Sequence, residues 1–260
     1  RSTRQSAGRI RAIIRDLVEA RRIAIAGGSA PDDLATKIMT TQDAQTGKTF
    51  SDAEMIDQVA VFFLAGHETS ASALGWALYL LALDPDTQAL VAAEAEQELG
   101  DASDFSAVTR LKHARDVFRE ALRLYPPVPM MVRQTMQAEP FRDRVLKKGA
   151  LAILSLWHLH RHERLWDNPH GFDPGRWKTD NGKACQRDAF IPFSAGPRVC
   201  TGAGFAMVEG VLLLAMLVAR WEFRLIEGRH PQPVAHLTVR AANGVWLELI
   251  PRVDASGGDI

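Results

Sequence analysis

The chain has very few cysteines: its 260 residues include only Cys185 and Cys200. The two do not form a CxxC pair, and they cannot build the disulfide framework that is typical of small secreted domains. We therefore expect the protein to work in a reducing compartment, and we assign it to the cytoplasm.

Long apolar stretches and an excess of either charge are missing as well. The longest uninterrupted apolar run covers residues 211–218, whereas a helix needs about 20 apolar residues to cross a bilayer. We therefore expect no membrane-spanning segment and no secretory signal. Lysine plus arginine and aspartate plus glutamate both number 31, which argues against a nucleic-acid binder that works through bulk charge.

Apolar residues make up 47% of the chain, which is enough to bury a substantial core. Their helical spacing and the capping residues predict helices over residues 9–22, 32–39, 51–83, 85–99, 113–124 and 205–220. Strands are expected over residues 128–135 and 150–156, with a terminal hairpin over 237–250 around Asn243-Gly244. The predicted fold class is mainly α with small β-sheets, helical over residues 1–125 and mixed over 126–260.

One ten-residue segment near the C-terminus is the most informative part of the sequence. It reads Phe193-Ser-Ala-Gly196-Pro-Arg198-Val-Cys200-Thr-Gly202, and an apolar helix follows it. Glycines frame the cysteine at the start of that helix, where the helix dipole and unpaired backbone amides stabilise a thiolate. Such a loop can hold a soft anionic ligand for one metal ion. The alternative is a buried, inert cysteine in a tight turn.

The pattern F-x-x-G-x-R-x-C-x-G is matched at every fixed position, and here the chain resembles the cytochrome P450 family. The resemblance implies a cytochrome P450-like fold and a haem b cofactor whose iron has Cys200 as its axial ligand. It also implies that Phe193, Gly196 and Gly202 belong to the haem-binding loop. Arg198 is implied to bind a haem propionate, because arginine pairs well with carboxylates.

A second motif, Ala65-Gly66-His67-Glu68-Thr69, lies in the middle of the long predicted helix. Glycine inside a helix costs about 1 kcal/mol relative to alanine, which suggests close approach of a flat ligand or a local opening of the helix. The segment resembles the distal-helix motif of the same family. This implies that Ala65 and Gly66 border the haem and that Glu68 and Thr69 assist dioxygen protonation. The alternative is a kinked core helix whose Thr69 hydroxyl bonds a carbonyl one turn earlier.

Three charged residues are expected to form a buried structural network. Glu120 and Arg123 lie three apart on one predicted helix, and Arg176 follows in a segment that resembles a family motif. A buried ion pair of this kind needs its remaining hydrogen bonds filled. Arg133, ten residues past Arg123, is implied to bind a haem propionate; the alternative is a solvated strand arginine.

Two further groups of residues have simpler interpretations. His158, His160 and His162 lack the spacing of a closed zinc site, so we expect them to be structural or solvent-facing. Five basic residues flank motifs that lie on the proximal side of the haem in the family: Lys112, Arg115, Arg119, Lys183 and Arg187. They suit the docking of an acidic electron donor, or they are ordinary solvated charges.

The resemblance as a whole implies a monooxygenase. It would insert one oxygen atom from O2 into a lipophilic substrate, with electrons from NAD(P)H delivered by a ferredoxin or a flavoprotein reductase. The expected substrate contacts are Ala65, Thr69 and residues 127–132 and 241–245. The resemblance covers only the C-terminal portion of the family, so we expect the N-terminal part of the fold to be missing. The alternatives are a truncated haem-binding remnant without turnover and a peroxide-using or isomerase relative.

Overall fold

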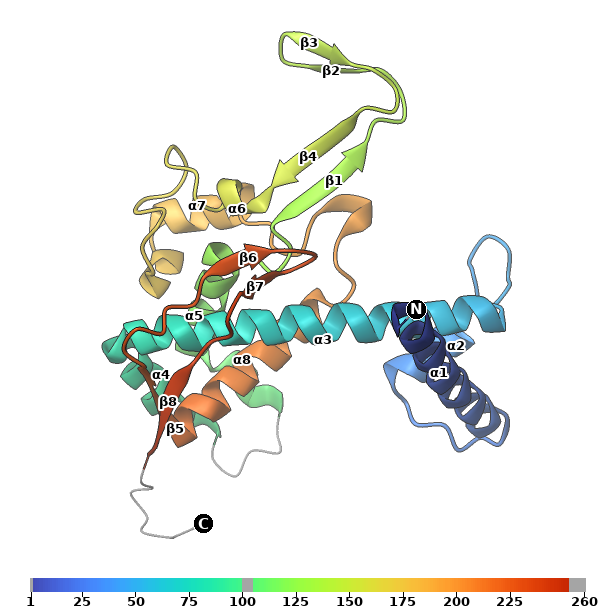
Figure 1. Ribbon diagram of the computed structural model, residues 1–260, viewed down its shortest axis with the longest axis horizontal. Helices are drawn as coiled ribbons and strands as arrows, with labels where there is room; N and C mark the ends of the chain where they lie inside the picture. The colour runs from blue at the N-terminus through green and yellow to red at the C-terminus, as the bar shows by residue number, and fades with distance from the viewer. Residues whose placement is uncertain (1, 100–104, 253–260) are drawn as a thin grey trace. The chain divides into compact units, whose positions relative to one another are not determined.

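The computed structural model of the chain describes residues 2–99 and 105–252 (Figure 1). The chain divides into two compact units, Arg1–His67 and Glu68–Ile260. The long helix α3 (Asp52–Leu83) contributes residues to both units. The assignment of the whole chain to a single domain remains a prediction.

The first unit is a small helical assembly. It consists of α1 (Ser2–Ala26), α2 (Leu34–Thr40) and the first half of α3. Ile14 and Val18 of α1 pack against Met55 and Ile56 of α3. The other apolar residues of the predicted α1 face are exposed: Ile10, Ile13 and Leu17. Only part of that face is therefore used within this unit.

Side-chain caps set where the long helices begin. At the start of α3 the Ser51 amide donates to Glu54 Oε2 (2.9 Å), and the Glu54 amide donates to Ser51 Oγ (3.4 Å). Asp84 separates α3 from α4 (Pro85–Leu99), because its carboxylate accepts from the Thr87 amide (3.0 Å). Both caps confirm the sequence prediction.

The core of the second unit lies between four helices. The C-terminal half of α3 and the helices α4, α5 (Lys112–Leu124) and α8 (Ala203–Arg220) enclose it. Figure 1 shows α4, α5 and α8 gathered beside that half of α3. The fully buried side chains include Ala77, Leu81, Val91, Val117, Phe118, Leu214 and Val218. Burial of this apolar surface is the main term that stabilises the unit.

Helix α8 is more apolar as a whole than the run over residues 211–218 suggested. Within the described ranges it is the one helix that is long and apolar enough, by length and composition, to cross a membrane. The expectation of no membrane-spanning segment rested on the uninterrupted run over residues 211–218 and did not take the whole helix into account. Val211, Leu214 and Val218 are buried with residues of α4 and α5, so core packing accounts for the apolar character of that face.

The described strands form four antiparallel sheets of two strands each. The pairs are β1 (Met130–Gln134) with β4 (Leu151–Ser155), β2 (Glu139–Phe141) with β3 (Arg144–Leu146), β5 (Trp221–Leu225) with β8 (Leu247–Pro251), and β6 (Pro233–Ala235) with β7 (Val239–Ala241). The β1–β4 pair, in register from Met130 opposite Ser155 to Gln134 opposite Leu151, confirms the two predicted strands. In Figure 1 this pair continues directly into the β2–β3 hairpin.

The hairpin predicted over residues 237–250 is wrong. Gly244 makes a turn there with a φ of 78°, but the strands on either side of it belong to different sheets. Strand β7 pairs with β6, and β8 returns to β5, where Leu249 lies opposite the buried Phe223. Pairing with a strand that carries a core residue fixes the register more strongly than a local hairpin would.

Within the described parts of the chain, five short helices connect the larger elements. They are η1 (Phe105–Thr109), α6 (Leu156–Leu159), η2 (Pro174–Lys178), α7 (Asp180–Asp188) and η3 (Gly196–Arg198). Trp166, Trp177 and Cys185 form a small second cluster of buried residues around η2 and α7. This cluster supports the segment that carries Arg176.

Gly182 permits the close contact between α7 and η2. A Cβ at this position would overlap Arg176 O and lie 2.6 Å from Arg176 C, both of which are backbone atoms. Gly182→Ala should therefore lower the free energy of unfolding by about 1–3 kcal/mol, measured by urea denaturation. The matched control is Gly75→Ala in α3, where the new Cβ would meet only Val245 Cγ2 at 3.9 Å. Equal losses in both variants would contradict the close contact.

Candidate functional site

The cysteine loop, residues 193–202, folds back on itself before helix α8. The Cys200 amide donates to Phe193 O (2.8 Å), which closes the loop across η3. Gly196 has a φ of 66°, a conformation that favours glycine. The Ala203 amide donates to Cys200 O (3.3 Å) and joins the loop to the start of α8. The cysteine therefore lies just before the N-terminus of a long helix, as the sequence predicted.

The two cysteines differ in their accessibility. Cys200 is exposed, whereas Cys185 is buried, and the Cys185 thiol donates to Leu165 O (3.0 Å). Burial raises the pKa of the Cys185 thiol, which keeps this thiol protonated and unreactive. The thiol that a ligand can reach is that of Cys200.

The surroundings of Cys200 suit a large apolar ligand that carries a metal ion. Its Sγ lies 3.9 Å from the position that a Cβ on Gly202 would take, an ordinary contact distance, so Gly202 borders the sulfur directly. Val199 and Phe205, which flank the cysteine in the chain, have exposed fractions of 53% and 71%. Exposed apolar side chains beside a soft sulfur donor fit haem, which offers iron to the sulfur and an apolar ring to the side chains.

Two arginines that were predicted to bind propionates lie at this loop. Arg133 extends from β1, and its Nη2 donates to Ser194 Oγ (2.9 Å). Ser194 itself has a φ of 65°, which is uncommon for a residue with a side chain. Arg198 lies in η3 and is exposed, so an anionic group can reach its guanidinium. The structure thus brings Arg133 to the loop from a strand about 60 residues earlier in the chain.

The α3 motif is divided between the two units. Ala65 and Gly66 belong to the first unit, and Glu68 and Thr69 belong to the second. Helix α3 continues through these residues without a break, so the local opening of the helix is not seen. Apart from its two chain neighbours and the backbone of the adjoining helical turns, no atom of the described residues lies within 4 Å of where a Cβ on Gly66 would be. Close approach of a ligand at Gly66 stays a prediction.

Glu68 has partners that sequence reasoning missed. Its Oε1 accepts from Thr238 Oγ1 (2.6 Å), and Arg240 Nε lies 3.8 Å from the same oxygen. One turn along α3, Ser72 Oγ donates to Val239 O. These contacts fix the orientation of the Glu68 carboxylate. No sequence pattern points to Thr238, because it lies 170 positions away from Glu68.

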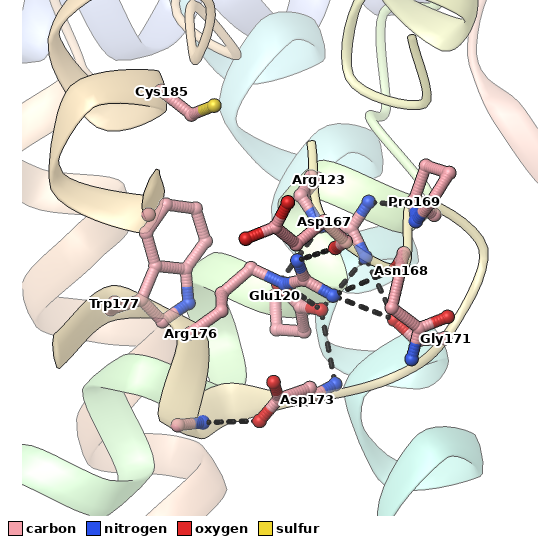
Figure 2. A network of polar contacts seen from close by, with 12 residues as sticks. Glu120, Arg123, Asp167, Asn168, Pro169, Gly171, Asp173, Arg176, Trp177 and Cys185 are labelled. Atoms are coloured by element: carbon pink, nitrogen blue, oxygen red, sulfur yellow. Dashed lines mark hydrogen bonds and ion pairs between the residues drawn. The ribbon is translucent and has the colours of Figure 1, made fainter. Parts of the chain in front are cut away.

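The predicted network of Glu120, Arg123 and Arg176 is confirmed (Figure 2). Glu120 and Arg123 are fully buried, and Arg176 is 3% exposed. Arg123 donates from Nε to Glu120 Oε2 (2.9 Å) and from Nη2 to Oε1 (2.8 Å), while Arg176 Nε donates to the same Oε1 (2.9 Å). Further guanidinium donors reach the backbone oxygens of His160, Asp167, Asn168, Pro169 and Gly171. The ions are both paired and hydrogen-bonded, which is the condition for burying charge.

The three histidines are structural or solvent-facing, as predicted. His158 Nδ1 shares a hydrogen bond with Ser155 Oγ (2.8 Å), and His162 Nδ1 accepts from a backbone amide two residues later (3.2 Å). His160 is fully buried, and its Nε2 accepts from the Ile191 amide (3.1 Å). Within residues 2–99 and 105–252, no group of three or more His, Cys, Asp or Glu side chains could hold a metal ion.

The basic residues that were expected to attract an acidic partner are partly compensated. Arg115 and Arg119 each lie 3.8 Å from Asp116 Oδ1, and Arg187 pairs with Asp188 (2.8 Å). Burial, and then the charge of Arg115, lowers the pKa of Arg119. Their combined positive potential is therefore weaker than their number suggests.

Comparisons with known proteins agree with this arrangement. The family model described as Cytochrome P450 matches residues 1–246. The chain is 38% identical over 220 residues to cyclooctatin synthase of Streptomyces melanosporofaciens, an alignment that covers 84% of this chain and 47% of that protein. It is 34% identical over 221 residues to cyclooctat-9-en-7-ol 5-monooxygenase of the same organism, covering 85% and 48%.

A solved structure supports the fold directly. The crystal structure of the cytochrome P450DA heme domain superimposes with a TM-score of 0.84 at 30% identity, covering 94% of this chain and 53% of that chain. The predicted fold, mainly α with small β-sheets, is thereby confirmed. The chain spans about half the length of the relatives that it matches.

Proposed function

This chain belongs to the cytochrome P450 family. From that premise we propose that it binds haem b through Cys200 and forms the haem-binding part of a monooxygenase. The reaction is the insertion of one oxygen atom from O2 into a lipophilic substrate. The observation that carries the proposal is the exposed Cys200 thiol, held in a closed loop before α8 and flanked by exposed apolar side chains. One of the relatives is named a monooxygenase, which supports the reaction class.

The chain supplies the groups that would hold the cofactor. Cys200 provides the sulfur ligand, and when bound the haem supplies an iron that activates O2 for oxygen transfer. Arg133 and Arg198 pair with the propionates through their guanidinium groups. The remaining loop and helix positions that border the ring are Phe193, Gly196, Gly202, Ala65 and Gly66.

Glu68 and Thr69 serve proton delivery in this proposal. Thr238 and Arg240 engage Oε1 of the Glu68 carboxylate, which leaves Oε2 as the oxygen that exchanges protons with solvent. The side chain is 41% exposed, so water reaches it. The Thr69 hydroxyl follows in the next position of α3 and would hold and pass on a proton along this path.

The partners follow from the reaction class. Two electrons come from NAD(P)H through a ferredoxin or a flavoprotein reductase, and we place the reaction in the cytoplasm. The lipophilic substrate contacts residues 127–132, 241–245 and the α3 motif. Several of these side chains are apolar and exposed, among them Val128, Met130 and Val132.

Isotope labelling tests the proposed reaction. The haem-loaded protein is supplied with a reductase, NADPH and a panel of lipophilic compounds under 18O2. We expect products that carry one 18O atom each. Products that form only with added peroxide would identify a peroxide-using relative instead, and the absence of any product from a haem-loaded, thiolate-ligated protein would overturn the monooxygenase proposal.

Thr69→Ala should uncouple NADPH consumption from product formation. Removing the hydroxyl affects a proton-transfer step and leaves the fold intact, so the ratio of product to NADPH consumed should fall by about tenfold or more while peroxide rises. Both quantities are measured in the same reaction. Thr109→Val is the control, because the Thr109 hydroxyl is exposed and donates only to a neighbouring carbonyl. Unchanged coupling in Thr69→Ala would leave this residue a structural part of α3.

A further inference from the structure

His160 joins the buried ion network to the cysteine loop. It ends the short helix α6 and is fully buried. Its backbone oxygen accepts from Arg123 Nη1 (2.9 Å), and its ring Nε2 accepts from the Ile191 amide (3.1 Å). Ile191 lies two residues before Phe193, whose oxygen accepts from the Cys200 amide (2.8 Å). Arg123 is thus connected to Cys200 through three hydrogen bonds, the His160 residue and the backbone between Ile191 and Phe193.

The hydrogen bond to Ile191 defines the tautomer of the ring. Since Nε2 accepts, it carries the lone pair, and the single proton of the neutral ring lies on Nδ1. Nδ1 is buried and makes no hydrogen bond of normal geometry among the described residues, although the backbone of Arg123 and Leu122 interacts favourably with the protonated ring. The well-formed hydrogen bond of the ring is therefore the one that Nε2 accepts from the Ile191 amide.

The ring keeps this acceptor at neutral and mildly acidic pH. Burial, followed by the charges of Arg123 and Arg161, lowers the pKa of His160 to about 3. Phe190 packs against the ring with a centroid distance of 5.3 Å. The charged groups that act on the ring are Arg123, which is paired with Glu120, and Arg161, which follows α6. A neutral imidazole is the stable form in this setting.

We propose that His160 is a positioning residue for the thiolate ligand: through the Ile191 amide, it anchors the start of the cysteine loop to the Glu120–Arg123–Arg176 network. Loss of this anchor frees the segment between Ile191 and Phe193, and with it the acceptor that holds the Cys200 amide. The consequence for ligation rests on the proposed haem function; the anchoring of Ile191 does not.

Two measurements on the haem-free protein test the anchor itself. Nitrogen-15 NMR of the wild-type His160 ring should show an unprotonated Nε2 and a protonated Nδ1 from pH 5 to pH 8; the opposite tautomer would overturn the proposal.

In His160→Leu the Ile191 amide should exchange with solvent about tenfold faster, and in His160→Gln, which retains an acceptor, it should exchange at close to the wild-type rate. The Phe223 amide, which donates to Gln88 Oε1 (2.7 Å) elsewhere in the core, is the internal control for global unfolding.

The same variants test the effect on ligation. In the reduced, carbon monoxide-bound state, His160→Leu should lose thiolate-type absorption in favour of the form with a protonated thiol, and His160→Gln should restore it. A wild-type spectrum in His160→Leu, or unchanged Ile191 exchange, would overturn the positioning role. If the wild-type protein showed no thiolate-type spectrum, the haem proposal would fail, and the exchange data would still decide the anchoring of Ile191.

Discussion

Glu120→Ala should lower the free energy of unfolding by about 3–5 kcal/mol. Glu120 is fully buried, and its two oxygens receive hydrogen bonds from Arg123, Arg176 and the Asp173 amide. Removing the carboxylate leaves two like charges in a site that water does not reach. Urea denaturation of the haem-free protein measures the loss. Because single domains have only about 5–15 kcal/mol of stability in total, much of the variant should be unfolded at 37 °C.

An exposed pair with the same spacing provides the control for this prediction. Glu19 and Arg22 also lie three apart on one helix, but both side chains are about half exposed. Glu19→Ala should therefore change stability far less than Glu120→Ala, since solvent already screens the charges. Similar losses in the two variants would contradict the importance of burial. A Glu120→Ala protein as stable as the wild type would show that the network does not stabilise the fold.

Cys200→Ala should abolish thiolate ligation of haem completely. The other thiol in the sequence, that of Cys185, cannot replace it, because it is buried and bonded to Leu165 O. Any haem that still binds should do so through its apolar ring and its propionates alone, with lower affinity and without a sulfur-to-iron absorption band. Titration of the haem-free protein with hemin, followed in the Soret region, measures both the affinity and the ligand type.

Cys185→Ala tests whether the haem spectrum depends on Cys200 in particular or on any thiol of the protein. This change removes one weak hydrogen bond from the cluster around Trp166 and Trp177, so it should lower stability slightly and leave the haem spectrum unchanged. A changed spectrum in Cys185→Ala, with a normal one in Cys200→Ala, would mean that the wrong cysteine has been assigned.

The features that could be predicted from the sequence depend on neighbouring residues or on a dense motif. The Ser51–Glu54 cap needs only four residues, and the turn at Asp84 needs a carboxylate before a proline. The cysteine loop has five fixed positions within ten residues, so its family resemblance was informative. The partnership of Glu120 with Arg123 followed from helical spacing, and the motif around Arg176 supplied the third member.

The features that were missed join residues that lie far apart in the chain. The contact of Arg133 with Ser194 spans 61 positions, and that of Thr238 with Glu68 spans 170. A hydroxyl group takes part in both contacts, and a single hydroxyl residue leaves no periodic trace in a sequence. The hairpin around Gly244 failed for a related reason: the turn was identified correctly, but tertiary packing chose the strand partners.

The reduced, carbon monoxide-bound difference spectrum of the haem-loaded chain tests the central claim most directly. It reports haem binding, thiolate ligation and reducibility of the iron in one trace. If Cys200 is the axial ligand, the wild-type protein should show the absorption band of a thiolate-ligated haem, and Cys200→Ala should lack it. A wild-type spectrum typical of haem with a neutral ligand, or a thiolate band that persists in Cys200→Ala, would contradict the claim.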